Sequence, residues 1–276
     1  MKVFVINLDR APERLAHMRA ELGRIGVPFE RMPAVDGGAL PAAEIARWTA
    51  TPMADGTRLT PGEIGCILSH RKCWEAAAAA NEPVAVFEDD VFLSADAAAF
   101  LRDATWLPTD ADIVKLETFL RPTLVDKEAV AAGARRLSRL RSLHAGTGGY
   151  VVSPAGARRL LSFGDKIALP LDHLMFDPAS PAFADLVSYQ LEPAVCIQGQ
   201  VAGSRRGSGT AAMSGSDATV FASALKRQRT DRRPYKSPAE RIWREVRRPF
   251  VRFGDALARA VANATTPRRW TTVAFR

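Results

Sequence analysis

Residues Val84-Ala85-Val86-Phe87-Glu88-Asp89-Asp90 join a short apolar run to three consecutive carboxylates. The apolar run is typical of a strand that is buried on both faces. Such a strand would deliver the carboxylates to its C-terminal end, where open α/β sheets bind ligands. Adjacent negative charges resist burial unless a cation compensates them, and Mg²⁺ and Mn²⁺ bind carboxylate oxygens. The stretch therefore predicts a cation site at a strand end, with a solvated acidic turn as the alternative.

Length and composition place the chain among ordinary globular proteins. It has 276 residues, of which 47% are hydrophobic and 25% are charged, so it can bury one large core or two smaller ones. Its three cysteines lack CxxC spacing, which argues against a disulfide framework or a zinc site and favours a reducing cytosol. No apolar run is long enough for a signal peptide or a membrane span. We expect a protein that is soluble or lies on a membrane face.

Positive charge is concentrated at the C-terminal end of the chain. Residues 201–276 contain 17 Lys and Arg against 5 Asp and Glu, whereas residues 1–200 contain 21 against 25. A basic balance that arises from one terminal segment gives no support to nucleic-acid binding by the whole chain. We therefore expect no nucleic-acid partner.

Strand and helix patterns alternate along the first 200 residues. Leu15, Met18 and Leu22 recur at helical spacing, and Thr60-Pro61-Gly62-Glu63 is typical of a helix start with a capping box. Strands that alternate with helices imply an α/β fold, with a mostly parallel sheet and helices on both faces. The predicted strands are 3–7, 29–35, the acidic strand from Val84, 112–117 and 149–152, and the predicted helices are 12–25, 60–80 and 153–163.

Four segments, in order along the chain, resemble glycosyltransferase family 25. They are Ile6-Asn7-Leu8-Asp9-Arg10 with Arg14, Gly62-Glu63-Ile64-Gly65-Cys66 running to Ser69-His70, Phe87-Glu88-Asp89-Asp90, and Gly146-Thr147-Gly148-Gly149-Tyr150. The family contains bacterial lipopolysaccharide and lipooligosaccharide galactosyltransferases and relatives of the collagen galactosyltransferases. The resemblance covers roughly residues 2–200 and excludes the tail.

The resemblance implies a fold of the GT-A type with a Rossmann-like sheet. It also implies a metal-dependent, inverting transfer from a UDP-sugar donor, most often UDP-galactose. Mn²⁺ or Mg²⁺ would neutralise the departing diphosphate. By resemblance Asp90 is the direct metal ligand, with Glu88 beside it. Either Glu88 or Asp89 would hold the ribose hydroxyls or a metal-bound water, and the sequence does not rank these two.

Donor-binding residues are expected after the first strand and in two later segments. Asn7 can pair with a uracil edge and Arg14 with phosphate, since both lie at the ligand crevice of an open sheet. Gly148 permits close approach of its backbone to the donor, although a bulge or a tight turn explains it equally well. Gln198, at a strand end, would approach the diphosphate.

Three further residues have competing interpretations. An inverting transferase needs a carboxylate that deprotonates the acceptor hydroxyl, and by resemblance this catalytic base is Asp172; a helix N-cap is the alternative. Glu63 either lines the site or completes the capping box with Thr60. His70 either lines the crevice or packs on the sheet.

The C-terminal segment predicts a separate role. We divide the chain into a glycosyltransferase domain (1–201), a flexible basic linker (202–236) and an amphipathic helical tail (237–276) that Pro249 kinks or splits. Basic faces with Trp and Phe suit an anionic membrane surface, which residues 226–262 would bind. Packing of the tail on the catalytic domain or on another subunit is the alternative.

These predictions combine into a peripheral enzyme on the cytoplasmic face of a bacterial inner membrane. Its acceptor would be a lipid-linked or saccharide molecule of the lipopolysaccharide type. A non-catalytic nucleotide-sugar-fold module that uses its basic tail as a membrane or assembly adaptor is the alternative from a different class. Binding of UDP that Mn²⁺ strengthens would separate the two.

Overall fold

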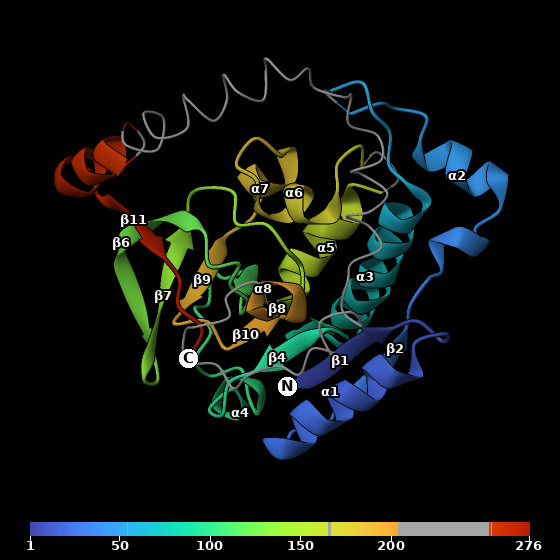
Figure 1. Ribbon diagram of the computed structural model, residues 1–276, viewed down its shortest axis with the longest axis horizontal. Coiled ribbons are helices and arrows are strands. Elements are labelled where there is room, and N and C mark those ends of the chain that lie inside the picture. Colours follow the sequence, from blue (N-terminus) through green and yellow to red (C-terminus); the bar gives the residue numbers. More distant parts are fainter. Residues whose placement is uncertain (54, 165–166, 204–253, 255) are drawn as a thin grey trace.

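A nine-stranded sheet forms the centre of the molecule (Figure 1). The computed structural model describes residues 1–53, 55–164, 167–203, 254 and 256–276. The strand order is β11-β6-β7-β9-β5-β8-β3-β1-β2, and β10 and β4 form a separate two-stranded sheet. The strands are β1 (Lys2–Asn7), β2 (Glu30–Pro33), β3 (Val84–Glu88), β4 (Val91–Leu93), β5 (Ile113–Lys115), β6 (Pro122–Ala132), β7 (Arg135–Leu140), β8 (Gly149–Val152), β9 (Ser188–Glu192), β10 (Cys196–Gln198) and β11 (Arg268–Thr272).

Helices cover both faces of this sheet, as predicted. They are α1 (Pro12–Arg24), α2 (Ala42–Trp48), α3 (Pro61–Ala80), α4 (Ala98–Leu101), α5 (Pro154–Ser162), α6 (Leu171–Phe176), α7 (Pro181–Asp185) and α8 (Gly199–Gly203), with a 3-10 turn at Gly37–Ala39. Figure 1 shows α3 and α5 on one side of the sheet and α1 on the other. Within the parts of the chain that the structure describes, no helix has both the length and the apolar character needed to cross a bilayer.

The alternation of side chains along β1 explains the two layers of helices. Val3 and Val5 belong to the hydrophobic cluster on the α1 side, whereas Phe4 and Ile6 belong to the cluster on the α3 side. Successive residues of a strand point to opposite faces of the sheet. A strand that is apolar throughout therefore needs cover on both faces.

The predicted α/β class is confirmed, and antiparallel strands extend the sheet beyond the prediction. β2, β1 and β3 run parallel, as do β5 and β9, while β8 runs antiparallel between β3 and β5. The hairpin of β6 and β7 continues the sheet with further antiparallel pairs. Much of β6 is exposed, so it lacks the apolar run that identified β3 from sequence.

Local signals for the starts of two helices are confirmed. At α3, the Thr60 hydroxyl accepts the N–H of Glu63 at 3.2 Å, and the Glu63 carboxylate accepts the N–H of Thr60 at 2.8 Å. At α5, the Ser153 hydroxyl accepts the N–H of Gly156 at 3.1 Å. The capping box fixes where α3 begins, and therefore which of its residues face the sheet.

The predicted helical tail is wrong at its C-terminal end. Of residues 202–276, those from 204 to 253 and residue 255 lie outside the described residues; residues 256–265 are helical, but β11 adds a strand to the main sheet beside β6. Val273 is buried, and its carbonyl accepts the Thr118 hydroxyl at 2.7 Å. The end of the chain therefore packs on the main domain. Helical periodicity cannot detect this, because the strand is stabilised by pairing with a distant partner.

Candidate active site

Polar side chains gather at the edge of the sheet where β1 and β3 end. These strands are parallel neighbours, so Asn7 and Glu88 leave the sheet at the same edge. β8 is antiparallel to β3 and begins there, where the Gly148 carbonyl accepts the N–H of Glu88 at 3.0 Å. This edge is the position in which open α/β sheets bind ligands. The structure thus brings the acidic stretch, Asn7 and Gly148 together, as predicted.

Glu88 is held by side chains from three other segments. Thr147 Oγ1 donates to Oε1 at 2.5 Å, Gln198 Nε2 donates to Oε2 at 2.9 Å, and His70 Nε2 lies 3.5 Å from Oε1. Burial acts to raise the pKa of this carboxyl, but the contacts with His70 and Thr147 outweigh burial and lower the pKa below its usual value. Glu88 is therefore an ionised carboxylate with a fixed orientation.

Arg14 bridges the other two carboxylates of the stretch. Its guanidinium nitrogens lie 3.1 Å from an Asp89 oxygen and 2.9 Å from Asp90 Oδ2. Asp89 and Asp90 are only 6% and 4% exposed, which excludes a solvated turn. Asp90 Oδ1 is buried and has no hydrogen-bond donor among the described residues. A buried carboxylate oxygen without a donor is costly, and a bound cation would satisfy it.

The pKa values of Asp89 and Asp90 are both raised, because Arg14 neutralises the buried negative charge only in part. Burial and the negative charge of Glu88 raise the pKa of Asp90 to about 8, against the opposing effect of Arg14. Burial also raises the pKa of Asp89, although Arg14 and Asn7 oppose it. One guanidinium does not neutralise three carboxylates, so this edge of the sheet favours a further positive charge. Its oxygen donors fit a hard divalent cation such as Mn²⁺ or Mg²⁺.

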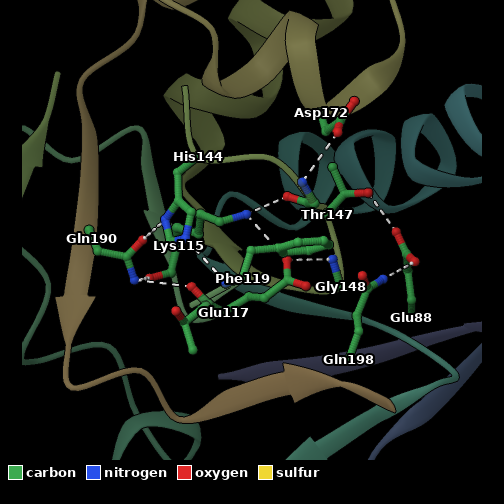
Figure 2. A network of polar contacts seen from close by, with 12 residues as sticks. Glu88, Lys115, Glu117, Phe119, His144, Thr147, Gly148, Asp172, Gln190 and Gln198 are labelled. Carbon is green, nitrogen blue, oxygen red and sulfur yellow. Dashed lines mark hydrogen bonds and ion pairs between the residues drawn. The ribbon is translucent and has the colours of Figure 1, made fainter. Parts of the chain in front are cut away.

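A buried ion pair lies beneath the loop that carries Thr147. Lys115 Nζ is 3.2 Å from Glu117 Oε2, and both side chains are wholly buried. Figure 2 shows how the pair holds the loop: Lys115 donates to the Gly146 carbonyl, and the Gly148 N–H donates to Glu117 Oε2 at 3.0 Å. Burial raises the pKa of Glu117 to about 7, and Lys115 opposes this shift. The loop backbone is thus fixed from below by two opposite charges.

The predicted base contacts the same loop. Asp172 Oδ2 accepts the N–H of Gly146 at 3.3 Å, and Figure 2 shows the Asp172 carboxylate on the opposite side of the loop from Glu117. Asp172 lies in the first turn of α6, and Pro170 occupies the N-cap position. The alternative in which Asp172 is the N-cap is therefore wrong, because the helix begins one residue before it. The role of Asp172 as base stays a prediction.

Asn7 supports the acidic stretch in this structure. Its Nδ2 donates to the Ala11 carbonyl at 2.9 Å and to Asp89 Oδ2 at 2.7 Å. Its Oδ1 accepts from Arg31 Nε at 3.1 Å. These bonds use both hydrogens and the oxygen of the amide, so Asn7 orients Asp89. Asn7 can pair with a uracil edge, as predicted, only if some of these hydrogen bonds break when the donor binds.

Gly148 and Gln198 pack against each other beside Glu88. A Cβ at Gly148 would lie 2.8 Å from Gln198 Cγ and 2.8 Å from Glu117 Oε1. Packing within the protein therefore requires glycine at this position whether or not a donor approaches it. The predicted contacts of Gly148 and Gln198 with a donor stay predictions.

His70 lies beside Glu88, whereas Glu63 acts in the helix cap. His70 is 1% exposed; its Nδ1 lies 2.9 Å from the Tyr150 hydroxyl, and its Nε2 faces Glu88. The interpretation in which His70 packs on the sheet is therefore confirmed, because it contacts Tyr150 of β8; its role in lining the ligand site stays a prediction. Glu63 Oε2 accepts from the backbone and the hydroxyl of Thr60 at 2.8 and 2.9 Å, which confirms the capping box.

Comparison with known proteins identifies the family. A model described as glycosyltransferase family 25 (LPS biosynthesis protein) matches residues 1–175. The chain belongs to glycosyltransferase family 25. Members of this family are sugar transferases, so the family 25 chain is an enzyme, and the alternative of a non-catalytic adaptor loses its support.

Curated relatives of the family 25 chain are named for the biosynthesis of lacto-N-neotetraose or of lipooligosaccharide. Lacto-N-neotetraose biosynthesis glycosyltransferase LgtB of Neisseria gonorrhoeae is 35% identical over 72% of this chain and 74% of the relative. Lipooligosaccharide biosynthesis protein lic2B of Haemophilus influenzae is 31% identical over 71% and 75%. Among solved structures, galactosyltransferase LgtC shares 12% identity over 87% of this chain and 99% of that chain, with a TM-score of 0.36. That structural likeness is too low to add to the argument.

Sequence reasoning about the family 25 chain missed Lys115 and Glu117. Glu117 closely follows strand β5, much as Glu88 ends β3, so the same strand-end argument identifies it. Lys115 offered no comparable signal, because a lysine within a strand is normally exposed. Only the fold shows that it is buried against Glu117.

Proposed function

We propose that this glycosyltransferase moves galactose from UDP-galactose to an acceptor of the lipopolysaccharide or lipooligosaccharide type, with inversion and with Mn²⁺ or Mg²⁺ bound. The proposal is carried by Asp90, a buried carboxylate that follows the C-terminal end of β3 and has one oxygen that lacks a donor among the described residues. The name of lic2B, a lipooligosaccharide biosynthesis protein, and the family description support the acceptor class. The choice of galactose follows the family resemblance.

Each residue of the acidic stretch has a role that suits its position. Asp90 and Glu88 would hold the cation, which supplies charge neutralisation on the diphosphate. Arg14, which now spans Asp89 and Asp90, would bind the diphosphate, because a guanidinium pairs with phosphate as well as with carboxylate. Asp89, oriented by Asn7, would accept hydrogen bonds from the ribose hydroxyls.

Asp172 would accept the proton of the acceptor hydroxyl as that oxygen attacks the sugar. The N–H groups of Gly146 and His173 hold the two carboxylate oxygens at 3.3 and 2.9 Å. The loop that orients Asp172 through Gly146 also orients Glu88 through Thr147. A positioned base of this kind contributes about 10²–10⁴-fold to the rate, so Asp172→Asn should lower transfer by that factor and leave binding of UDP unchanged.

The full chain, supplied with Mn²⁺ and a panel of UDP-sugars, tests the proposal by mass spectrometry of the products. We expect turnover of UDP-galactose, with loss of transfer on chelation and in Asp90→Asn. Asp126→Asn is the matched control, since this aspartate pairs with Arg141 on the β6–β7 hairpin. If Asp90→Asn retains metal-stimulated transfer, Asp90 is not the metal ligand. If the enzyme turns over a different UDP-sugar, the proposed donor UDP-galactose is wrong.

We also propose peripheral attachment to the cytoplasmic face of the inner membrane. Residues 226–262 contain 12 Lys and Arg against 4 Asp and Glu. In the helical residues 256–265, Leu257 and Val261 are 57% and 53% exposed. Exposed apolar side chains beside cationic charge suit an anionic membrane surface. Vesicles that contain phosphatidylglycerol should bind the full chain, and the double substitution Leu257→Ser/Val261→Ser should weaken binding; equal binding by both proteins would contradict the proposal.

A further inference from the structure

We propose a second metal site, for a softer divalent ion such as Zn²⁺, formed by Cys66, His70 and Glu88 where α3 faces the end of β3. One ligand atom from each residue lies within 4.8 Å of the other two. Zn²⁺ binds thiolate sulfur and imidazole nitrogen, whereas Mg²⁺ and Mn²⁺ prefer oxygen. The site is therefore chemically distinct from the oxygen site at Asp90, although the two share Glu88.

The fold assembles these ligands from two elements. Cys66 and His70 are four residues apart on α3, and residues at this spacing are neighbours on one helix face. Glu88 comes from the end of β3. The absence of CxxC spacing argued against zinc, but that argument applies only to sites built from pairs of cysteines. A helical Cys-x₃-His pair that a distant glutamate completes is apparent only in the tertiary structure.

His70 is positioned as a ligand by its other ring nitrogen. Its Nε2 is buried, makes no hydrogen bond among the described residues, and lies 3.5 Å from Glu88 Oε1. Two ligands of a tetrahedral Zn²⁺ at about 2.1 Å lie about 3.4 Å from each other. Nδ1 lies 2.9 Å from the Tyr150 hydroxyl, which accepts Trp74 Nε1–H at 2.9 Å. Histidines that bind metals are commonly oriented through the second nitrogen in this way.

Cys66 and Glu88 complete the ligand set. Cys66 is partly exposed, so an ion can reach it from solvent. Desolvation and the negative charge of Glu88 raise the pKa of its thiol well above the usual value, so a bound ion must displace the proton from sulfur. Thr147 and Gln198 already orient the Glu88 carboxylate. Three protein ligands leave the fourth tetrahedral position for water.

The proposed site would make transfer sensitive to Zn²⁺. An ion held by Cys66 and His70 withdraws Glu88 from the cation that assists the diphosphate. The existence of the site depends only on its own geometry, whereas this inhibition rests on the proposed function. The two parts therefore need separate readouts.

Absorption of Co²⁺ reports the ligand set without any assay of transfer. A thiolate bound to Co²⁺ gives a charge-transfer band in the near ultraviolet, which we expect when the full chain is titrated with Co²⁺ and which Zn²⁺ should abolish. Cys66→Ser should lose the band. Cys73→Ala is the matched control, because Cys73 lies on the same helix in the hydrophobic core, and it should retain the band. No band in the wild-type chain, or an unchanged band in Cys66→Ser, would overturn the site.

Transfer assays distinguish this inference from the proposed function. In Mn²⁺, added Zn²⁺ should inhibit the wild type and Cys73→Ala at concentrations about tenfold or more below those that inhibit Cys66→Ser; equal inhibition of all three would overturn the inhibitory role. Asp90→Asn should lose transfer and keep the cobalt band. If Asp90→Asn retained both transfer and the cobalt band, the metal site at Asp90 would be wrong and the Cys66 site would stand. Normal Mn²⁺-dependent transfer without a band would count against the thiolate site alone.

Discussion

Lys115 and Glu117 form a wholly buried ion pair, 3.2 Å between Nζ and Oε2, beneath the loop that connects Asp172 with Glu88. Removal of one member of a buried pair typically costs about 3–5 kcal/mol, because it leaves the other charge uncompensated. Lys115→Met should therefore lower the free energy of unfolding by about this amount. The double substitution Lys115→Met/Glu117→Gln removes both charges and should recover most of the loss. Urea unfolding measures both values.

Sugar transfer should also depend on the Lys115–Glu117 pair, and restoring stability in the double variant should not restore the rate. The double variant lacks the ammonium that binds the Gly146 carbonyl, so we expect a lower kcat with little change in the KM for the donor. Arg269→Met/Glu192→Gln is the control, since this partly buried pair at 2.6 Å lies on β11 and β9, away from the loop. An equal fall in kcat in both double variants would show that the Lys115 pair acts through general stability alone.

The metal-free enzyme should be less stable at about pH 8 than at about pH 6. Burial raises the pKa of Asp90 to about 8 and that of Glu117 to about 7. A carboxyl group whose pKa is higher in the folded state stabilises the fold while it is protonated. This contribution is complete below about pH 4 and is lost as the pH rises through the folded-state pKa values.

Urea unfolding in chelator, repeated across this pH range, measures the effect. Asp90→Asn should reduce the slope, because its amide does not titrate there. Added Mn²⁺ should stabilise the protein more at the higher pH, where the carboxylates are ionised. If the metal-free protein became more stable between about pH 6 and about pH 8, the raised pKa values of Asp90 and Glu117 would be contradicted.

Gly148→Ala should disturb the packing around Glu88, because the added methyl group has no room. The new Cβ would lie 2.8 Å from Gln198 Cγ and 2.8 Å from Glu117 Oε1, and insertions into a packed interior cost about 1–3 kcal/mol. Transfer should fall as well, because Gln198 would shift from Glu88. Gly23→Ala, in α1 with nothing within 4 Å of its Cβ, is the control and should raise stability by about 0.5–1 kcal/mol. If Gly148→Ala left transfer unchanged, Gln198 would have no role in the active site.

Glu63→Gln tests whether Glu63 acts only in the capping box. Glutamine completes a capping box as glutamate does, so transfer should stay within about twofold of the wild type if capping is its whole role. Thr60→Ala, which removes the cap itself, should cost about 1 kcal/mol of stability. A large loss of transfer in Glu63→Gln at unchanged stability would instead assign this carboxylate to the substrate site.

Sequence alone determined the features that depend on residues close together in the chain. The capping box of Thr60 and Glu63 placed α3, because it involves one helical turn. The apolar run before Glu88 placed β3 and brought its carboxylates to the ligand-binding edge of the sheet. These patterns, with the family resemblance, predicted the α/β class and the acidic centre of the site.

Tertiary structure decided which charges meet and which segments pair. Arg14 reaches Asp89 and Asp90 across more than 70 residues of sequence, and Lys115 is buried only because β5 lies inside the sheet. β11 forms a strand because β6 offers it an edge, although the tail predicted helix. Each of these contacts depends on distances between remote segments, which periodicity and capping within one segment do not specify.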